Sequence, residues 1–160
     1  MNKNIFLNRE IVLIKHLKGA PGLRFFGTGP NLLPCKGLYK LKKLLDKNTS
    51  WAKKRKLKDL KHCLANSDAI VSLWSNNKIL GFGRALSDGI YRSVLWDIVI
   101  DHQHQGKGYG KLIVKSLLES KKINQSEKVY LMTSTQKNFY CQIGFKEVLS
   151  QNLLIKTIKN

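Results

Sequence analysis

Glycine alternates with other residues in the segment Gln105-Gly106-Lys107-Gly108-Tyr109-Gly110-Lys111, which lies between an apolar stretch and an amphipathic one. Glycine lets backbone N–H groups approach a ligand closely, because it has no side chain and tolerates left-handed backbone angles. The start of a helix adds positive potential at the same point, and Lys107 and Lys111 add two charges. The segment therefore predicts a binding site for a diphosphate group.

Two well-known phosphate motifs do not fit this segment. A P-loop needs Gly-x-x-x-x-Gly-Lys followed by Ser or Thr, but Gln105 stands at the first glycine position and Leu112 replaces the hydroxyl residue. The dinucleotide fingerprint Gly-x-Gly-x-x-Gly would place Lys111 where its third glycine is needed. Nucleotide binding of either kind is not predicted.

The pattern that does fit is Gln/Arg-x-x-Gly-x-Gly/Ala, which Gln105, Gly108 and Gly110 match. Further along, the chain contains Phe139-Tyr140-x-x-x-Gly144-Phe145. Together these motifs resemble the GNAT superfamily of acyl-CoA N-acyltransferases. Other segments resemble its cyanobacterial and plastid branch, which includes enzymes described as serotonin or protein-lysine acetyltransferases: Ala65-Asn66-Ser67, Gly81-Phe82-Gly83-Arg84-Ala85, Ser87-Asp88-Gly89 and Leu95-Trp96-Asp97.

The resemblance implies an acetyl-CoA-dependent N-acetyltransferase in which a primary amine attacks the thioester directly, within a ternary complex. The acceptor would be an arylalkylamine or a protein lysine. Backbone groups of one strand would contact the pantetheine arm, one N–H would polarise the acetyl carbonyl, and the glycine segment would hold the pyrophosphate. The implied cofactor contacts are Ile98, Val99, Ile100, Gln105, Gly106, Lys107, Gly108, Tyr109, Gly110, Lys111 and Asn138.

Asp97 is the candidate general base, acting directly or through water. A carboxylate in an apolar strand is costly unless it has a purpose or a partner. Strand alternation would place its side chain on the face opposite Trp96 and Ile98. The alternative is a structural ion pair with Arg84 or Arg92.

Tyr140 is the candidate general acid, which would protonate the departing thiolate of CoA. Many members of the family use as their general base a glutamate at a position other than that of Asp97, and Val94 occupies one such position here. The alternative for Tyr140 is a packing role in a short helix. Asp88, Asp97 and Asp101 could together form an acidic mouth that would attract an amine.

The charge balance is strongly basic: 29 Lys and Arg face 10 Asp and Glu, for a formal net charge of +19. Such a field favours polyanions, and the run Lys53-Lys54-Arg55-Lys56 keeps a nucleic-acid-binding module open as an alternative. Because the basic residues are spread through the chain and no nucleic-acid motif appears, surface solvation is the preferred interpretation. A non-catalytic acyl-CoA-binding protein is the other alternative.

The cysteines and histidines predict neither a disulfide nor a metal site. Cys35, Cys63 and Cys141 form no Cys-x-x-Cys pair, which favours a reducing compartment. His102 and His104 lie too close together in the chain to complete a tetrahedral metal site. No apolar run approaches a membrane span, so we expect a cytoplasmic protein, or a stromal one if it is organellar. Assembly into a homodimer is an alternative that the sequence leaves open.

The elements that must position these residues follow an α/β pattern. We expect helices over 36–47, 51–65, 108–121 and 136–143, and strands over 11–17, 69–74, 78–86, 91–100, 128–133 and within 145–158. Residues 48–50 would cap the second helix, and 11–17 would be an edge strand. The expected fold is a mixed, mostly antiparallel sheet, splayed between two central parallel strands and flanked by helices. Residues 36–160 would form the GNAT domain, after a poorly defined N-terminal segment, 1–35.

Overall fold

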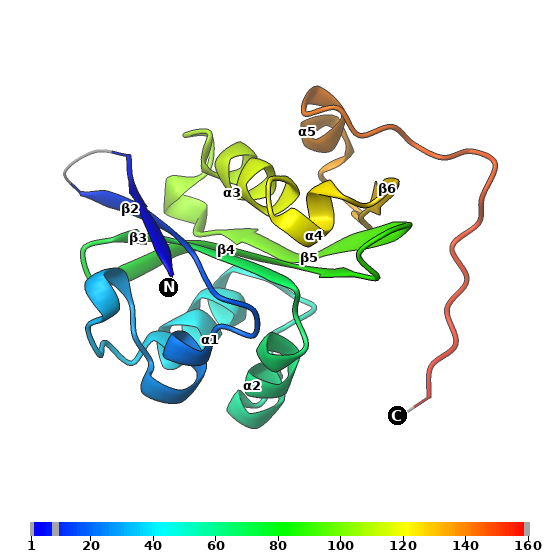
Figure 1. Cartoon of the computed structure of the whole chain (residues 1–160). Helices are drawn as coiled ribbons and strands as arrows, with labels where there is room; N and C mark the ends of the chain where they lie inside the picture. The colour runs from blue at the N-terminus through cyan, green and yellow to red at the C-terminus, as the bar shows by residue number, and fades with distance from the viewer. Residues whose placement is uncertain (1, 8–9, 159–160) are drawn as a thin grey trace.

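The computed structural model describes residues 2–7 and 10–158 (Figure 1). Within them, six strands form one sheet in the order of the chain. The strands are β1 (Lys3–Phe6), β2 (Ile11–Lys15), β3 (Ala69–Ser75), β4 (Lys78–Ser87), β5 (Arg92–Ile100) and β6 (Lys128–Tyr130). Neighbouring strands are antiparallel except β5 and β6, which are parallel. The predicted mixed, mostly antiparallel sheet is confirmed.

Helices cover both faces of the sheet (Figure 1). The helices α1 (Gly37–Asn48) and α2 (Leu57–Ala65) lie on one face, and α3 (Tyr109–Leu118) and α4 (Lys121–Asn124) lie on the other. The short helix α5 (Lys137–Gln142) follows β6, and the single turns η1 (Gly22–Phe26), η2 (Pro30–Leu32) and η3 (His102–His104) lie in the connections. No helix among the described residues is long and apolar enough to cross a membrane.

The two faces hold separate hydrophobic cores because side chains alternate along the strands. On β3, Ile70 and Trp74 pack with α1 and α2, whereas Val71 and Leu73 pack with α3. Both cores are made of buried aliphatic side chains, and the core beneath α1 and α2 also contains Trp74 and Phe82. Burial of such side chains dominates the free energy of folding. The sheet, packed on both faces, therefore supports the residues that lie at the ends of its strands.

Helix α3 lies close to β4 because β4 has two glycines where other residues would clash. A Cβ atom on Gly81 would lie 2.8 Å from the Cδ1 of Ile113, and one on Gly83 would lie 2.7 Å from its Cγ2. This close packing places α3 against β4, with eight residues, 101–108, between the end of β5 and the start of α3. The glycine segment lies between those two points.

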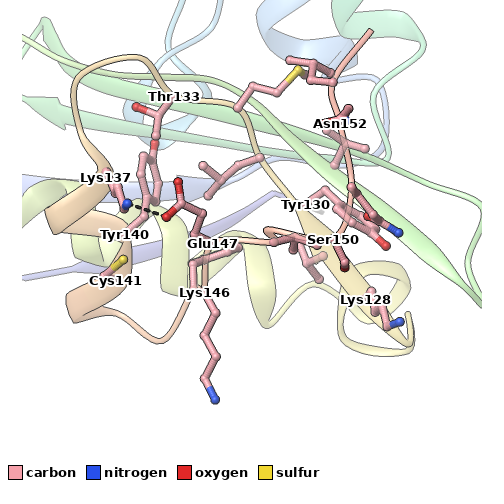
Figure 2. A pocket seen from close by; sticks show the side chains of 18 of the residues that line it. Lys128, Tyr130, Thr133, Lys137, Tyr140, Cys141, Lys146, Glu147, Ser150 and Asn152 are labelled. Atoms are coloured by element: carbon pink, nitrogen blue, oxygen red, sulfur yellow. Dashed lines mark hydrogen bonds and ion pairs between the residues drawn. The ribbon is translucent and has the colours of Figure 1, made fainter.

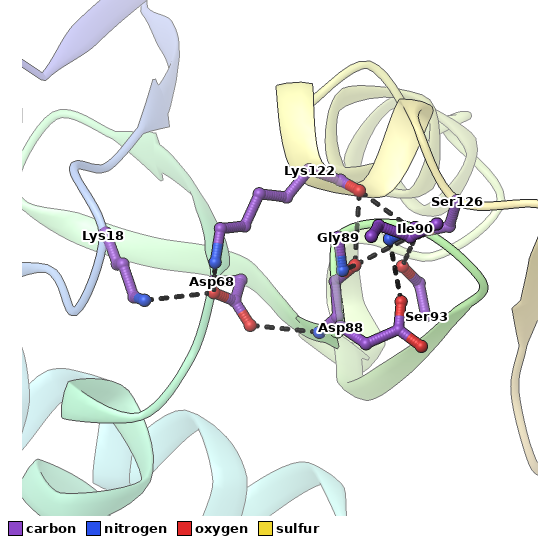
Figure 3. A network of polar contacts seen from close by, with 9 residues as sticks. Lys18, Asp68, Asp88, Gly89, Ile90, Ser93, Lys122 and Ser126 are labelled. Atoms are coloured by element: carbon purple, nitrogen blue, oxygen red, sulfur yellow. Dashed lines mark hydrogen bonds and ion pairs between the residues drawn. The ribbon is translucent and has the colours of Figure 1, made fainter.

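A polar network joins the loop before β3 and the turn between β4 and β5 to α4 (Figure 3). One oxygen of Asp68 accepts a hydrogen bond from Lys122 at 3.0 Å and lies 3.3 Å from the Lys18 amine, while the other accepts from the backbone N–H of Ser87. The Ser87 and Ser126 hydroxyls are 3.0 Å apart. Burial alone would raise the pKa of Asp68, but these donors lower it overall, so the carboxylate stays charged and holds the end of the sheet together.

Several expectations about the elements were wrong. Strand β2 is not an edge strand, since it pairs with both β1 and β3, so the sheet extends across the predicted boundary at residue 36. The helix expected over 108–121 is divided into α3 and α4. The described residues 145–158 contain no strand, and Leu154 there is 88% exposed. The parallel pair therefore lies at one edge of the described sheet rather than at its centre.

The second helix begins at Leu57, six residues later than predicted from Trp51. Thr49 does accept a hydrogen bond from the Ala52 N–H, at 3.3 Å, but this closes an isolated turn. Beyond it the chain stays irregular as far as residue 56, and Arg55 donates a hydrogen bond to Asp97 on β5 at 2.8 Å. The loop 49–56 is thus held by a contact that local sequence does not reveal.

Candidate active site

Strands β5 and β6 separate soon after they meet. They pair only at Arg92 with Lys128, Ser93 with Val129 and Val94 with Tyr130. From residue 95 to Ile100, the side of β5 that faces away from β4 has no partner strand among the described residues. A cavity of about 690 Å³ opens beside this free edge, so backbone groups of β5 are available to a ligand there.

The glycine segment forms one wall of this cavity and is open to it. Gly106 and Gly108 have φ of 76° and 78°, in the left-handed region that favours glycine. A Cβ atom at either position would meet nothing within 4 Å. Within the described structure, no acceptor binds the amide N–H groups of residues 106–111, the last three of which begin α3. Unpaired N–H groups at a helix start are suited to bind an anion.

Most of the predicted cofactor contacts line this cavity. They are Ile98, Val99, Ile100, Gln105, Gly106, Gly108, Tyr109, Gly110 and Lys111. Lys107 and Asn138 are exposed and do not line it. Their role as cofactor contacts stays a prediction.

Asp101 anchors the turn that carries the glycine segment. This buried carboxylate accepts a hydrogen bond from the Gln103 N–H at 3.0 Å and lies 3.5 Å from the Lys78 amine and 3.7 Å from that of Lys47. Burial would raise the pKa of Asp101, but the Gln103 N–H and the two lysines lower it overall. Gln105 also stabilises this turn, because its side-chain amide donates a hydrogen bond to the Ile100 carbonyl at 3.3 Å.

Tyr140 lines the cavity opposite the free edge of β5. Its ring packs edge-on against Phe139, with centroids 4.9 Å apart, and against Phe145, at 5.9 Å. Its hydroxyl makes no hydrogen bond with any residue that the structure describes. Burial raises the pKa of Tyr140 above its ordinary value of 10.0, so the hydroxyl keeps its proton at neutral pH and can donate a hydrogen bond.

Asp97 lies within an ion-pair network and does not line the cavity. Its Oδ2 accepts hydrogen bonds from the Arg84 Nε at 2.7 Å and the Arg55 Nη1 at 2.8 Å, and its side chain is 2% exposed. The alternative of a structural ion pair is thus realised with Arg84, and Arg55 is an unforeseen second partner. Arg92 instead lies 3.5 Å from Glu127. The role of Asp97 as general base stays a prediction.

A bulge in β5 explains why Asp97 lies where it does. Phe82 pairs with Val99, but Arg84 pairs with Trp96, so β5 has one extra residue at this point. Asp97 adopts a φ of 55°, which L residues other than glycine rarely adopt. The prediction that side chains alternate regularly across Asp97 is wrong. Regular alternation would place Leu95 and Val99 on the same face of the sheet, but Leu95 packs in the core beneath α3 and Val99 in the core beneath α1.

The acidic mouth is not present among the described residues. Asp97 and Asp101 are buried in ion pairs. Asp88 lies in a distant turn, where it accepts hydrogen bonds from three successive backbone N–H groups. Among residues 2–7 and 10–158, no Asp or Glu lines the cavity beside the free edge of β5.

Trp51 is a residue of the cavity that sequence reasoning missed. It lies in the irregular loop before α2 and is 54% exposed. The Arg55 guanidinium lies 5.2 Å from its ring centre, a cation–π contact that links the loop to the Asp97 network. The only signal in the sequence was a large aromatic residue next to a cap, which also fits a helix start.

Comparisons with known proteins indicate the family of the chain. The profile of the acetyltransferase (GNAT) domain matches residues 59–147. An uncharacterized N-acetyltransferase ycf52 from Pyropia yezoensis is 35% identical over 68% of this chain and 64% of its own length, and its counterpart from Gracilaria tenuistipitata var. liui is 32% identical over 85% and 75%. The crystal structure of a GNAT-family protein from Xanthomonas campestris pv. campestris superposes with a TM-score of 0.66, at 23% identity, over 82% of this chain and 90% of that one. The chain spans about two thirds of the length of the Pyropia relative.

Proposed function

The chain belongs to the GNAT family of N-acetyltransferases, and we propose that it transfers an acetyl group from acetyl-CoA to a primary amine. One observation carries the proposal: in the part of the chain that the structure describes, an open glycine turn with unpaired amide groups adjoins a strand edge that is also unpaired. Both are backbone features, and together they offer a row of donors to a long, polar and anionic ligand.

The residues present fit acetyl-CoA. The amide N–H groups of residues 106–111, with the Lys111 amine, would hold the diphosphate, and the free edge of β5 from Ile98 to Ile100 would contact the pantetheine amides. Acetyl-CoA supplies the activated thioester when it is bound. An N–H of β5 aimed at the acetyl carbonyl would stabilise the negative charge that develops on its oxygen.

Tyr140 would donate its hydroxyl proton, or a hydrogen bond, to the departing sulfur. A thiol has an ordinary pKa near 8.5, below that of the phenol, so full transfer is not driven and the hydrogen bond is the main contribution. The raised pKa of Tyr140 secures the protonated form over the physiological range.

Asp97 would position the strand rather than touch the substrate. Its two arginine partners both donate to the carboxylate oxygen Oδ2 and hold the bulge from which the free edge of β5 begins. As the N–C bond forms and the C–S bond breaks, the proton that the amine loses would pass through water to Asp97, which requires one arginine to give way to that water.

The test is acetyl transfer followed by mass spectrometry with a panel of amines, together with thermal melting. Saturating acetyl-CoA should raise the melting temperature, because a ligand at a hundredfold excess over its Kd stabilises the folded state by about 2.7 kcal/mol. An acetylated product should appear with at least one amine. A melting shift without any product would identify a non-catalytic acyl-CoA-binding protein, and the absence of both would overturn the proposal.

A further inference from the structure

We propose that residues 36–61, which include α1, the loop before α2 and the first half of α2, bind single-stranded nucleic acid through exposed lysines and a tyrosine. The inference goes beyond the proposed function and does not depend on it. This stretch of 26 residues contains eleven Lys and Arg and only two acidic residues, Asp46 and Asp59. It therefore has a net charge of +9, out of +19 for the whole chain of 160 residues, and we call it the basic layer.

The fold places the basic layer on one side of the sheet. Helices α1 and α2 cover the same face (Figure 1). Leu41 of α1 and Leu60 of α2 are buried in the core between these helices and the sheet, whereas Lys43, Lys58 and Lys61 are exposed. Although basic residues occur throughout the sequence, nearly half of the net charge thus lies in one layer of the fold.

The lysines of the basic layer lack acidic partners, unlike many of those elsewhere in the chain. Lys18 and Lys122 lie 3.3 Å and 3.0 Å from the same oxygen of Asp68 (Figure 3), and the Lys137 amine lies 2.5 Å from the Glu147 carboxylate (Figure 2). Seven exposed lysines of the layer form no ion pair with any residue that the structure describes: Lys36, Lys43, Lys53, Lys54, Lys56, Lys58 and Lys61. Uncompensated charges of one sign attract a polyanion, whose phosphates release counterions when lysines neutralise them.

Exposed aromatic rings lie among these cations. Tyr39 of α1 is 49% exposed, and the Lys43 amine lies 5.0 Å from its ring centre. The turn η1, which contacts both α1 and α2, exposes Phe25 and Phe26, and the Arg24 guanidinium lies 4.3 Å from the ring centre of Phe25. Unpaired bases stack on exposed rings, whereas the bases of a duplex are already stacked on one another. The rings therefore favour a single strand over a duplex.

A lipid surface fits the basic layer less well. A helix that lies in a membrane interface has lysines on one face and inserts its apolar face into the bilayer. The apolar faces of α1 and α2 are instead buried in the core of the protein, as Leu41 and Leu60 show. The layer presents cations and rings to the solvent, a combination that suits phosphates and bases.

The experiment measures fluorescence anisotropy of labelled oligouridine and oligothymidine, each about twenty nucleotides long, titrated with the full chain at several salt concentrations. Both single strands should bind, and a duplex of the same length should bind more weakly. A fourfold variant of exposed lysines should bind at least about tenfold more weakly at low salt. The slope of log K against log salt concentration should fall by about 3, since each lost contact removes about 0.7. The variant is Lys53→Gln, Lys54→Gln, Lys58→Gln and Lys61→Gln.

The matched control removes four exposed lysines outside the basic layer, so that both variants have the same net charge. It combines Lys115→Gln, Lys121→Gln, Lys146→Gln and Lys156→Gln. Because it leaves the layer intact, its affinity should fall by less than about threefold. Both fourfold variants should melt like the wild type and bind acetyl-CoA as it does, because the substituted side chains are exposed and none lines the cavity beside the glycine segment.

Tyr39 tests the stacking contact separately from the charges. Tyr39→Leu keeps an apolar side chain and loses the ring, so oligonucleotide affinity should fall about tenfold with an unchanged salt slope. Tyr39→Phe keeps the ring and should bind like the wild type. If the fourfold variant does not fold, this pair alone decides, because equal affinities of the two tyrosine variants would contradict stacking on α1.

Four results would overturn this inference and leave the proposed function standing. The two fourfold variants could weaken binding equally, which would mean that only the overall charge acts, or the duplex could bind as tightly as the single strands. Saturating acetyl-CoA could displace the oligonucleotide, which would place it at the glycine turn. Vesicles rich in phosphatidylserine could bind the chain while neither oligonucleotide does. A failure of the proposed function is recognised separately, as the absence of any melting shift with acetyl-CoA.

Discussion

At the scale of single residues, the candidate site relies on groups whose protonation is fixed by their surroundings. Burial raises the pKa of Tyr140. Burial would also raise the pKa of Asp101, but the Gln103 N–H, Lys78 and Lys47 lower it overall. The charge state of these groups does not change with the small pH changes that occur in a cell. The reactive geometry therefore rests on hydrogen bonds and ion pairs that persist over a wide pH range.

Tyr140→Phe removes one hydroxyl and keeps both ring contacts. We expect kcat to fall about a hundredfold, which is typical when a group that donates a proton or hydrogen bond is removed, with unchanged affinity for acetyl-CoA. Steady-state kinetics and a binding titration would measure the two effects. Tyr39→Phe, on the exposed surface of α1, is the matched control. Equal activity of the two variants would exclude Tyr140 from the reaction.

Asp97→Asn separates the two roles of this residue. Loss of the carboxylate leaves the guanidinium of Arg84 without its charge partner in a largely buried position, which costs about 3 kcal/mol. We expect a clear fall in the melting temperature and a lower kcat at every pH. A variant that melts like the wild type but loses activity would instead assign Asp97 as the general base.

His16 predicts a loss of stability at mildly acidic pH. Burial lowers the pKa of His16 from 6.5 to about 4, and its Nε2 lies 2.7 Å from the Ser72 Oγ. Below pH 6.5 the unfolded chain takes up a proton that the folded chain refuses, so the free energy of unfolding should fall from pH 6.5 to 4, by about 3 kcal/mol in total. Urea titrations at several pH values test this, and His16→Asn should remove the slope. An unchanged slope in that variant would assign the pH dependence to other groups.

At the scale of the elements, the sequence predicted what periodicity and glycine placement determine. The helix α1 and the strands β3, β4 and β5 lie within a residue or two of their predicted bounds, and the glycine turn before α3 is open as expected. The bulge at Asp97 and the loop before α2 were not predictable, because they depend on contacts between distant residues. Arg55 and Asp97, for example, are 42 residues apart in the chain.

The two leucine-rich segments should respond very differently to truncation. Leu41 of α1 is fully buried, whereas Leu154 of the C-terminal segment is 88% exposed. Leu41→Ala should therefore lower the free energy of unfolding by about 3 kcal/mol, and Leu154→Ala by less than about 0.5 kcal/mol. Chemical denaturation measures both. A large loss for Leu154→Ala would show that this segment packs against something in solution.

At the scale of the whole molecule, the net charge of +19 acts on any anionic ligand. Affinity for acetyl-CoA should fall as salt is added, because screening shortens the reach of these charges. Position should matter as well: Lys111 lines the cavity and Lys115, on the same helix, does not. Lys111→Gln should weaken binding more than Lys115→Gln, although each removes one charge. Equal losses would mean that only the overall field acts.

The central claim is that the open turn at the start of α3 binds the diphosphate of acetyl-CoA, and calorimetric titration of two glycine variants tests it most directly. Gly108 and Gly89 have φ of 78° and 84°, and a Cβ atom at either would meet nothing within 4 Å, so alanine strains both turns alike. Gly108→Ala should bind acetyl-CoA about tenfold more weakly than the wild type, whereas Gly89→Ala, in the turn before β5, should bind it normally. Equal binding by both variants would contradict the claim.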